Sequence, residues 1–181
     1  LGKIIEFVLG KYGKGLVPLA LAESYLEKET DEEKKLFYKS VSIVMEGAVN
    51  FILRYRDQLN EQAKDNDEWA ENMRKVANVC DNISKRPPET FHEATQALWF
   101  LFVILQMESN ASSFSPGRMD VYMYPYYKHD IDAGIETDQS VLEIIENLWL
   151  KFNEIVYMRN SNSAKFFAGF PIGFNIAIGG Q

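Results

Sequence analysis

The chain has 181 residues, of which 46% are hydrophobic and 13% aromatic, so it has enough apolar material for one sizeable core. Its net charge of −7 comes without a basic stripe or a polybasic segment, which argues against a nucleic-acid-binding protein and against a protein held on anionic membranes. The single cysteine, Cys80, rules out an internal disulfide and indicates a reducing compartment.

The first third of the chain has the periodicity of helices. Apolar residues at helical spacing run to about residue 29, with glycines interrupting the pattern. Thr30 or Asp31 then offers an N-cap, because each carries a side-chain oxygen that can accept from the free amides of a first turn. From there the apolar residues repeat every three or four positions, which predicts one long amphipathic helix to about Gln62.

Proline and a capping box divide the middle of the chain. A helix is predicted to start at Asn66 or Asp67 and to end before the proline pair 87–88, because proline has no amide to donate within a helix. The next helix starts with a capping box, in which Thr90 caps the first turn and Glu93 reaches back to the cap. Both boundaries are therefore predicted from side-chain chemistry.

The second half begins with the most apolar helix of the chain, which includes residues 97–105 and is expected to be buried on every side. A polar break follows over 108–117, then helices over 119–132 and 141–158. Residues 174–178 alternate large apolar with small or polar residues, as in a strand. The chain is thus predicted to be mainly α, with about six helices and a terminal strand, in a single unit over 1–181.

Several kinds of site have no support in the sequence. There is no Walker loop and no HExxH motif, and the two histidines and one cysteine lie in distant segments, so no metal site is predicted. Cys80 lies on the apolar face of a helix, where a free cysteine usually acts as a small hydrophobic residue.

The polar loop after the apolar helix is the strongest candidate for a site. Its hydroxyl and amide side chains emerge from a core, where each unpaired buried group costs about 1–3 kcal/mol. The loop is therefore either packing that bonds to itself or a wall that lines a ligand. Gly117 allows a close backbone approach or a positive φ. Arg118 can bind a carboxylate through two hydrogen bonds, either on a ligand or on Asp120 or Glu108.

Four ordered groups of residues resemble the pyruvate formate-lyase-like glycyl-radical enzymes, and most of all their dehydratase and lyase branch. The resemblance covers about half of the chain. It rests on PPETFHEA (87–94) with the helix to QMESN (106–110), SPGRMDVYMYPYY (115–127), LWLKFNEI (148–155) and NIAIGGQ (175–181).

The resemblance implies a large cytoplasmic homodimer whose ten-stranded α/β barrel lies inside a helical shell. It also implies a partner, an iron–sulfur activating enzyme that uses S-adenosylmethionine to install a glycyl radical, and a cysteine thiyl that attacks the substrate. The Gly-Cys-x-Glu and Arg-Val-x-Gly-[Tyr/Phe] motifs for these steps do not occur in this sequence, and Cys80 lies in the wrong context. Both belong downstream of Gln181 in the family, so an internal fragment without catalytic residues is expected.

The resemblance also assigns roles within the polar loop. The positions matching Ser112 and Ser113 face the substrate in the family, so these two serines are expected to bind it, with Asn110, Arg118 and Asp120 supporting the loop. Glycerol dehydratases resemble His-Ser at the two positions and pyruvate formate-lyases resemble Ala-Ala. Two serines suit a small polar substrate and argue against both of those activities.

The leading interpretation is a fragment, inactive alone, of a glycyl-radical enzyme that cleaves a carbon–carbon or carbon–heteroatom bond. Two alternatives remain at this point. One is pyruvate formate-lyase proper, and the other is a non-catalytic helical interaction module.

Overall fold

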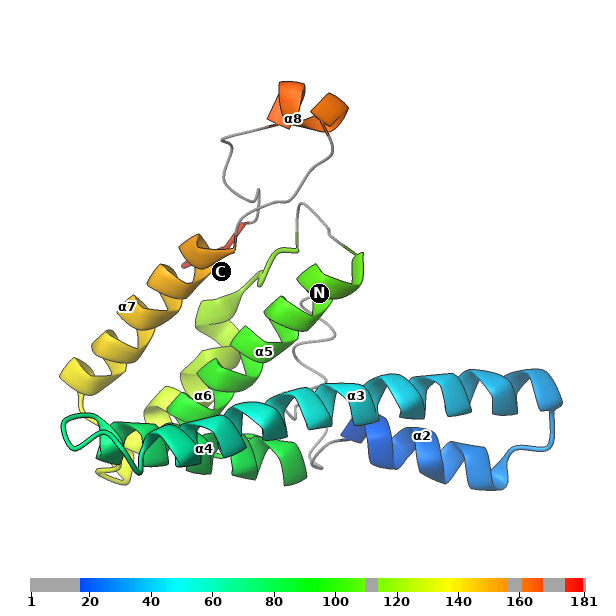
Figure 1. The fold of residues 1–181 in the computed structure, drawn as a ribbon, viewed down its shortest axis with the longest axis horizontal. Coiled ribbons are helices and arrows are strands. Elements are labelled where there is room, and N and C mark those ends of the chain that lie inside the picture. The colour runs from blue at the N-terminus through cyan, green and yellow to red at the C-terminus, as the bar shows by residue number, and fades with distance from the viewer. Residues whose placement is uncertain (1–16, 110–113, 156–160, 168–174, 181) are drawn as a thin grey trace. The chain divides into compact units, whose positions relative to one another are not determined.

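The computed structural model describes residues 17–109, 114–155, 161–167 and 175–180, and these are mainly helical, as predicted (Figure 1). They form seven helices, labelled α2 to α8, and one isolated β-bridge. The described chain divides into two compact units, one ending at Pro88 and the other starting at Glu89. They are called the N-terminal unit and the C-terminal unit below.

The N-terminal unit consists of α2 (Val17–Lys28), α3 (Glu32–Gln62) and α4 (Ala70–Lys85), with α3 packed against both of the others. The predicted cap of α3 is confirmed, because the Asp31 carboxylate accepts hydrogen bonds from the amides of Glu33 and Lys34 at 3.0 and 3.1 Å. The predicted end of the helix at Gln62 is also confirmed.

The start of α4 lies later than predicted. The Asn66 side chain accepts from the amide of Trp69 at 2.9 Å, so residues 66–69 form a turn and the helix begins at Ala70.

Polar contacts join α4 to α3 and to the residue that follows α3. Arg56 of α3 donates to Asp81 of α4 at 2.9 Å, and the Arg74 guanidinium donates to the carbonyl of Ala63 at 3.2 Å.

The C-terminal unit consists of α5 (Phe91–Ser109), α6 (Met119–Asp132), α7 (Asp138–Glu154) and α8 (Ser161–Phe167), and α5 packs against α6 and α7. The capping box at the start of α5 is confirmed in one half, since Thr90 Oγ1 accepts from the Glu93 amide at 3.2 Å. The Glu93 carboxylate accepts from the amide of Glu89 at 2.8 Å, which shows that it reaches one residue beyond the cap.

Aromatic residues form the contact between α5 and α7. The rings of Phe102 and Phe152 meet edge to face with centroids 4.9 Å apart, and Trp99 lies 6.1 Å from each of them. The expectation that α5 is buried on every side is wrong for its C-terminal part. Residues 103–106 are half-buried and Met107 is 60% exposed, because no described element covers this end of the helix.

The expected terminal strand is wrong within the described residues. Of residues 175–180, Ile176 alone forms a β-bridge, a parallel one with Gly117, and Phe174 lies outside the described residues. A strand needs a neighbour along its whole length, and a single bridge does not provide one. The α8 helix was not predicted, because its seven residues are too short for a periodic pattern.

One helix in the described ranges, α3, is long and apolar enough to cross a membrane by length and composition alone. Because core helices of water-soluble proteins pass the same test, this property assigns no membrane span.

Candidate functional site

The loop that precedes α6 is joined to the C-terminal segment 175–180 by main-chain hydrogen bonds. Gly117 donates to the carbonyl of Asn175 at 3.4 Å and accepts from the amide of Ala177 at 2.9 Å. The Ser115 hydroxyl adds a third bond by accepting from the amide of Asn175 at 3.0 Å. Two groups of residues that carry the family resemblance are therefore adjacent in space.

Asp120 extends this junction with its side chain. Its carboxylate accepts two hydrogen bonds from the Arg118 guanidinium, both of 2.9 Å, and one of 2.8 Å from the amide of Gly179. The hydrogen bonding to Arg118, and after it the bond from Gly179, lowers the pKa of Asp120 to about 2. Arg118 therefore braces Asp120, and Asp120 in turn joins the start of α6 to the segment 175–180.

Glycines provide the backbone conformations that the junction needs. Gly117 has φ +76°, and Gly179 and Gly180 have φ +75° and +88°. These are left-handed conformations that a side chain with a Cβ strongly disfavours. The expected positive φ at Gly117 is confirmed, and it lets the chain turn from the bridge directly into α6.

Tyr122 fixes the loop from the α6 side. Its hydroxyl donates to the carbonyl of Pro116 at 3.1 Å, and Pro116 is fully buried. Burial also raises the pKa of Tyr122 far above its ordinary value, so the phenol stays protonated and remains a donor. The loop is thus fixed by three side chains, those of Ser115, Asp120 and Tyr122.

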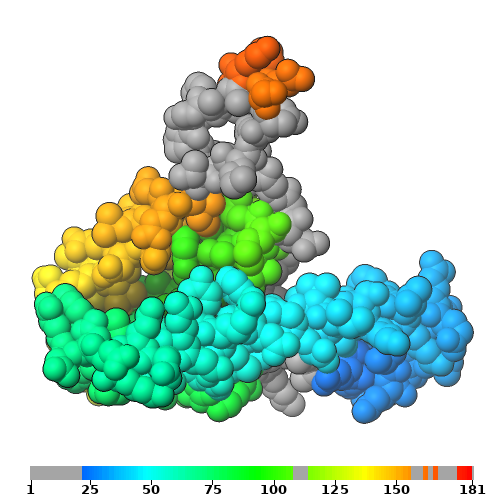
Figure 2. Space-filling model, in the orientation of Figure 1, coloured from blue at the N-terminus to red at the C-terminus, as the bar shows by residue number. Residues whose placement is uncertain are grey.

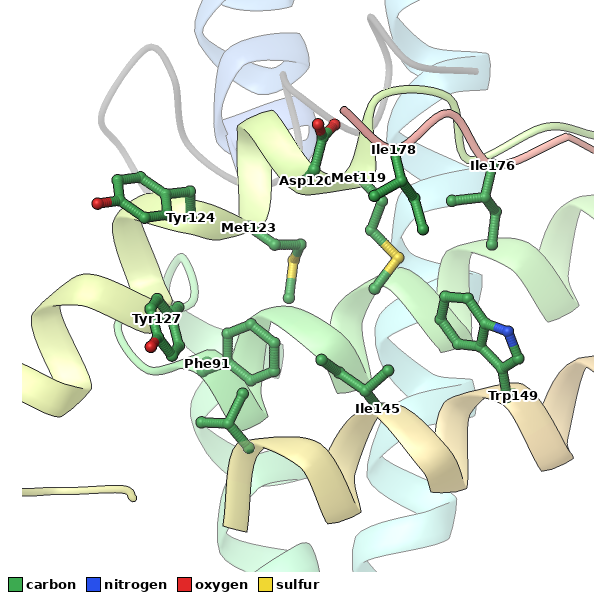
Figure 3. Close-up of a pocket in the computed structure, with 11 residues that line it drawn as sticks. Phe91, Met119, Asp120, Met123, Tyr124, Tyr127, Ile145, Trp149, Ile176 and Ile178 are labelled. Carbon is green, nitrogen blue, oxygen red and sulfur yellow. The ribbon is translucent and has the colours of Figure 1, made fainter. Parts of the chain in front are cut away.

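An apolar cavity of about 330 Å³ lies beneath the junction (Figure 3). Ile176 and Ile178 form one side, while methionine and tyrosine residues of α6 and apolar residues of α7 form the others. The full lining is Phe91, Met119, Asp120, Met123, Tyr124, Tyr127, Val141, Ile145, Trp149, Ile176 and Ile178. Such a lining suits packing better than polar chemistry, since Asp120 supplies its sole carboxylate and is already paired.

Of the five predicted site residues, the structure describes two, Arg118 and Asp120. Asn110, Ser112 and Ser113 lie outside the described residues, so their roles remain predictions. Arg118 and Asp120 lie together. The sequence did not predict the bond between Ser115 and Asn175, because no local pattern pairs residues that are 60 positions apart.

Two further titratable residues, Cys80 and Asp130, are buried in the core. Cys80 is fully buried, and this desolvation raises the pKa of its thiol to about 11, so it is not a reactive thiolate. Asp130 is also fully buried, and its carboxylate accepts from the amide of Phe91 at 2.7 Å and lies 2.9 Å from His129 Nδ1. Among the described residues, no three potential metal ligands come together.

Comparison with known proteins agrees with the residues at this junction. The profile of the pyruvate formate lyase-like family matches residues 14–181, so the chain belongs to this family. It is 36% identical over 148 residues to the probable dehydratase YbiW of Escherichia coli (strain K12). That match covers 80% of this chain and 18% of the relative, so the chain spans less than a fifth of that protein's length.

Solved glycyl radical enzymes share the fold. A glycyl radical enzyme from Archaeoglobus fulgidus matches 99% of this chain with a TM-score of 0.86 and 31% identity, over 24% of its own length. An enzyme of 1,2-propanediol dehydration from Roseburia inulinivorans matches 98% of this chain with a TM-score of 0.85 and 31% identity, over 22% of its own length. The relatives of this chain are thus glycyl radical dehydratases and lyases.

Proposed function

We propose that the chain is part of a glycyl radical dehydratase or lyase that acts on a small hydroxylated substrate. The observation that carries the proposal is the junction of 115–120 with 175–179, because it places two groups of family residues side by side in a chain whose relatives are such enzymes. The proposal concerns the whole protein, of which this chain supplies one part.

The substrate class comes from the chemistry of the relatives. Their names include a trans-4-hydroxy-L-proline dehydratase, isethionate sulfite-lyases and an enzyme that dehydrates 1,2-propanediol. Each of these substrates carries a hydroxyl group and is small. Ser112 and Ser113 offer two hydroxyls that can both donate to and accept from such a group, which suits them to line the substrate pocket.

The remaining predicted residues support that loop. Arg118 and Asp120 hold its C-terminal end through the pair described above, and Asn110 is proposed to hold its N-terminal end. The two compact units are proposed to be parts of one domain, which an α/β barrel in a helical shell completes. Closed surroundings of this kind keep radical intermediates away from water and stray hydrogen donors.

The radical chemistry belongs to other parts of the protein. We propose that a partner iron–sulfur activating enzyme uses S-adenosylmethionine to install a glycyl radical in a cytoplasmic homodimer, and that a cysteine thiyl attacks the substrate. The isolated chain is proposed to be inactive, because its sequence contains neither the Gly-Cys-x-Glu nor the Arg-Val-x-Gly motif.

The test is made on the full-length protein. Its gene should encode both motifs downstream of Gln181, and the protein should show a glycyl-radical signal in electron paramagnetic resonance after anaerobic activation. A gene that stops at Gln181 would favour the helical interaction module instead. Consumption of pyruvate and coenzyme A by the activated protein would assign pyruvate formate-lyase activity. Turnover by the isolated chain would refute the proposed inactivity.

A further inference from the structure

The segment 175–180 has two faces with different surroundings. Ile176 and Ile178 point into the apolar cavity between α6 and α7 (Figure 3). Because successive side chains alternate along an extended segment, Asn175 and Ala177 lie on the opposite face. That face carries a small residue and a polar one, and both are exposed. The polar group of this face is therefore the amide of Asn175.

The main chain of Asn175 is held on both sides. Its amide donates to Ser115 Oγ at 3.0 Å, and its carbonyl accepts from Gly117 at 3.4 Å. Its side-chain amide, in contrast, makes no hydrogen bond to the described part of the chain. A polar side chain on a fixed backbone needs little further ordering to bind a ligand, which lowers the entropic cost of the contact.

The chemistry of this amide suits an uncharged hydroxyl. Asn carries both a donor and an acceptor, so it can meet a hydroxyl group in either role. The cation of this junction, Arg118, is paired with Asp120 through two hydrogen bonds, so its charge is balanced within the protein. The junction therefore presents the uncharged amide of Asn175 next to the ion pair of Arg118 and Asp120.

We infer that Asn175 is a substrate-binding residue whose side-chain amide forms a hydrogen bond with a hydroxyl group of the substrate. The inference rests on the proposed function. It gives a role to Asn175, which the sequence analysis named only as part of a motif shared with the family. Asn175 contributes to binding, whereas the residues that fix its backbone, Ser115 and Gly117, act as positioning residues.

The test measures binding to the full-length protein before activation. The probes are 1,2-propanediol, glycerol, trans-4-hydroxy-L-proline and isethionate, each titrated by calorimetry. The wild type should bind at least one of them, and Asn175→Ala should weaken that binding about tenfold, as expected for one lost hydrogen bond. Asn147→Ala is the matched control, because its side chain donates to the carbonyl of Glu143 at 2.8 Å on the exposed side of α7.

The outcomes separate the inference from the proposed function. Unchanged binding in Asn175→Ala, equal weakening in the control, or no binding of any probe by the wild type would overturn the inference. A loss of melting temperature in Asn175→Ala without a change in affinity would do so too, since it would assign the amide a structural role. A missing radical signal after activation, with binding weakened by Asn175→Ala, would overturn the proposed function and leave the contact standing.

Discussion

The carboxylate of Asp120 accepts hydrogen bonds from Arg118 and Gly179, which lower its pKa to about 2. The carboxylate therefore stays charged at neutral pH and loses its charge only in strong acid. The pKa in the folded state lies below the ordinary value of about 3.9. The bonds therefore stabilise the junction fully above that ordinary value and are lost as the pH falls through the folded pKa.

We expect the amide resonance of Gly179 to stay constant in NMR spectra from neutral pH to about pH 4 and to move below it. Asp120→Asn should remove this movement, because an amide side chain does not titrate in this range. A Gly179 resonance that titrates with a midpoint near 4 in the wild type would show that the carboxylate is not held as described.

Gly117 offers a second test at the scale of one residue. A Cβ at this position would meet nothing within 4 Å, so the cost of Gly117→Ala comes from its φ of +76° and not from a clash. We expect a loss of about 1 kcal/mol in stability, together with faster hydrogen exchange at the amide of Ala177, which donates to Gly117.

Gly47 is the matched control for this substitution. It also has open space around its Cβ position, but it lies inside α3. Gly47→Ala should therefore raise stability by up to about 1 kcal/mol, because alanine favours the helix more than glycine does. Equal losses from both substitutions in denaturant titrations would show that backbone conformation is not the cause.

Between elements, the buried Asp130 joins α6 to the start of α5. Its carboxylate accepts from the amide of Phe91, which is one of the free amides of the first helical turn. Asp130→Ala should lower the free energy of unfolding by about 2–3 kcal/mol, because it leaves a buried donor without a partner.

The control for Asp130 is Asp132, two residues further along α6. Asp132 is exposed and pairs with Lys128 at 2.7 Å within the helix, so Asp132→Ala should change stability by less than about 0.5 kcal/mol. The two variants would be compared by urea unfolding. Similar losses from both would show that burial of the carboxylate does not matter.

At the same scale, the sequence predicted elements where local chemistry decides them. Asp31, Thr90 and the proline pair mark helix ends through their own side chains, and the structure agrees with each of them. The sequence did not predict that α4 starts at Ala70. The Asn66 side chain can either cap a helix or, as it does here, close a turn that precedes the helix. The expected strand at the C-terminal end is a single bridge between Ile176 and Gly117. Strand formation depends on partners that are distant in the sequence, so alternation of side chains alone did not predict it.

At the scale of the whole molecule, α3 of the N-terminal unit contributes the cyan surface in Figure 2. Large apolar side chains remain exposed on this helix. The most exposed are Leu36, Phe37, Ile43 and Val44, with exposed fractions of 55–66%. Apolar patches of this kind bind other apolar surfaces. The isolated chain should therefore bind the dye 1-anilinonaphthalene-8-sulfonate and self-associate in sedimentation experiments.

Charges placed on the patch should reverse this behaviour. Leu36→Glu with Phe37→Glu should reduce both dye binding and association. Ser40→Glu with Asn50→Glu adds the same charge to exposed positions of α3 without removing apolar surface, so it should have a smaller effect. A wild-type chain that stays monomeric without dye binding would contradict the prediction.

The candidate site was predictable to the extent that it lies in one stretch of sequence. Arg118 and Asp120 are two residues apart, and their pairing follows from local geometry. The contact of Asp120 with Gly179 could not be predicted from the sequence, because the two residues are 59 positions apart and meet only when the chain has folded. No periodicity in the sequence carries that information.

The bond between Ser115 and Asn175 also has a consequence for biosynthesis. The two residues are 60 positions apart, so Ser115 leaves the ribosome well before its partner has been made. At about 5–20 residues per second, the loop waits for roughly 3–12 seconds. During this interval α5 and α6 can pack, but the junction cannot close. We expect nascent chains that end before Asn175 to expose the apolar side of α6 to chaperones.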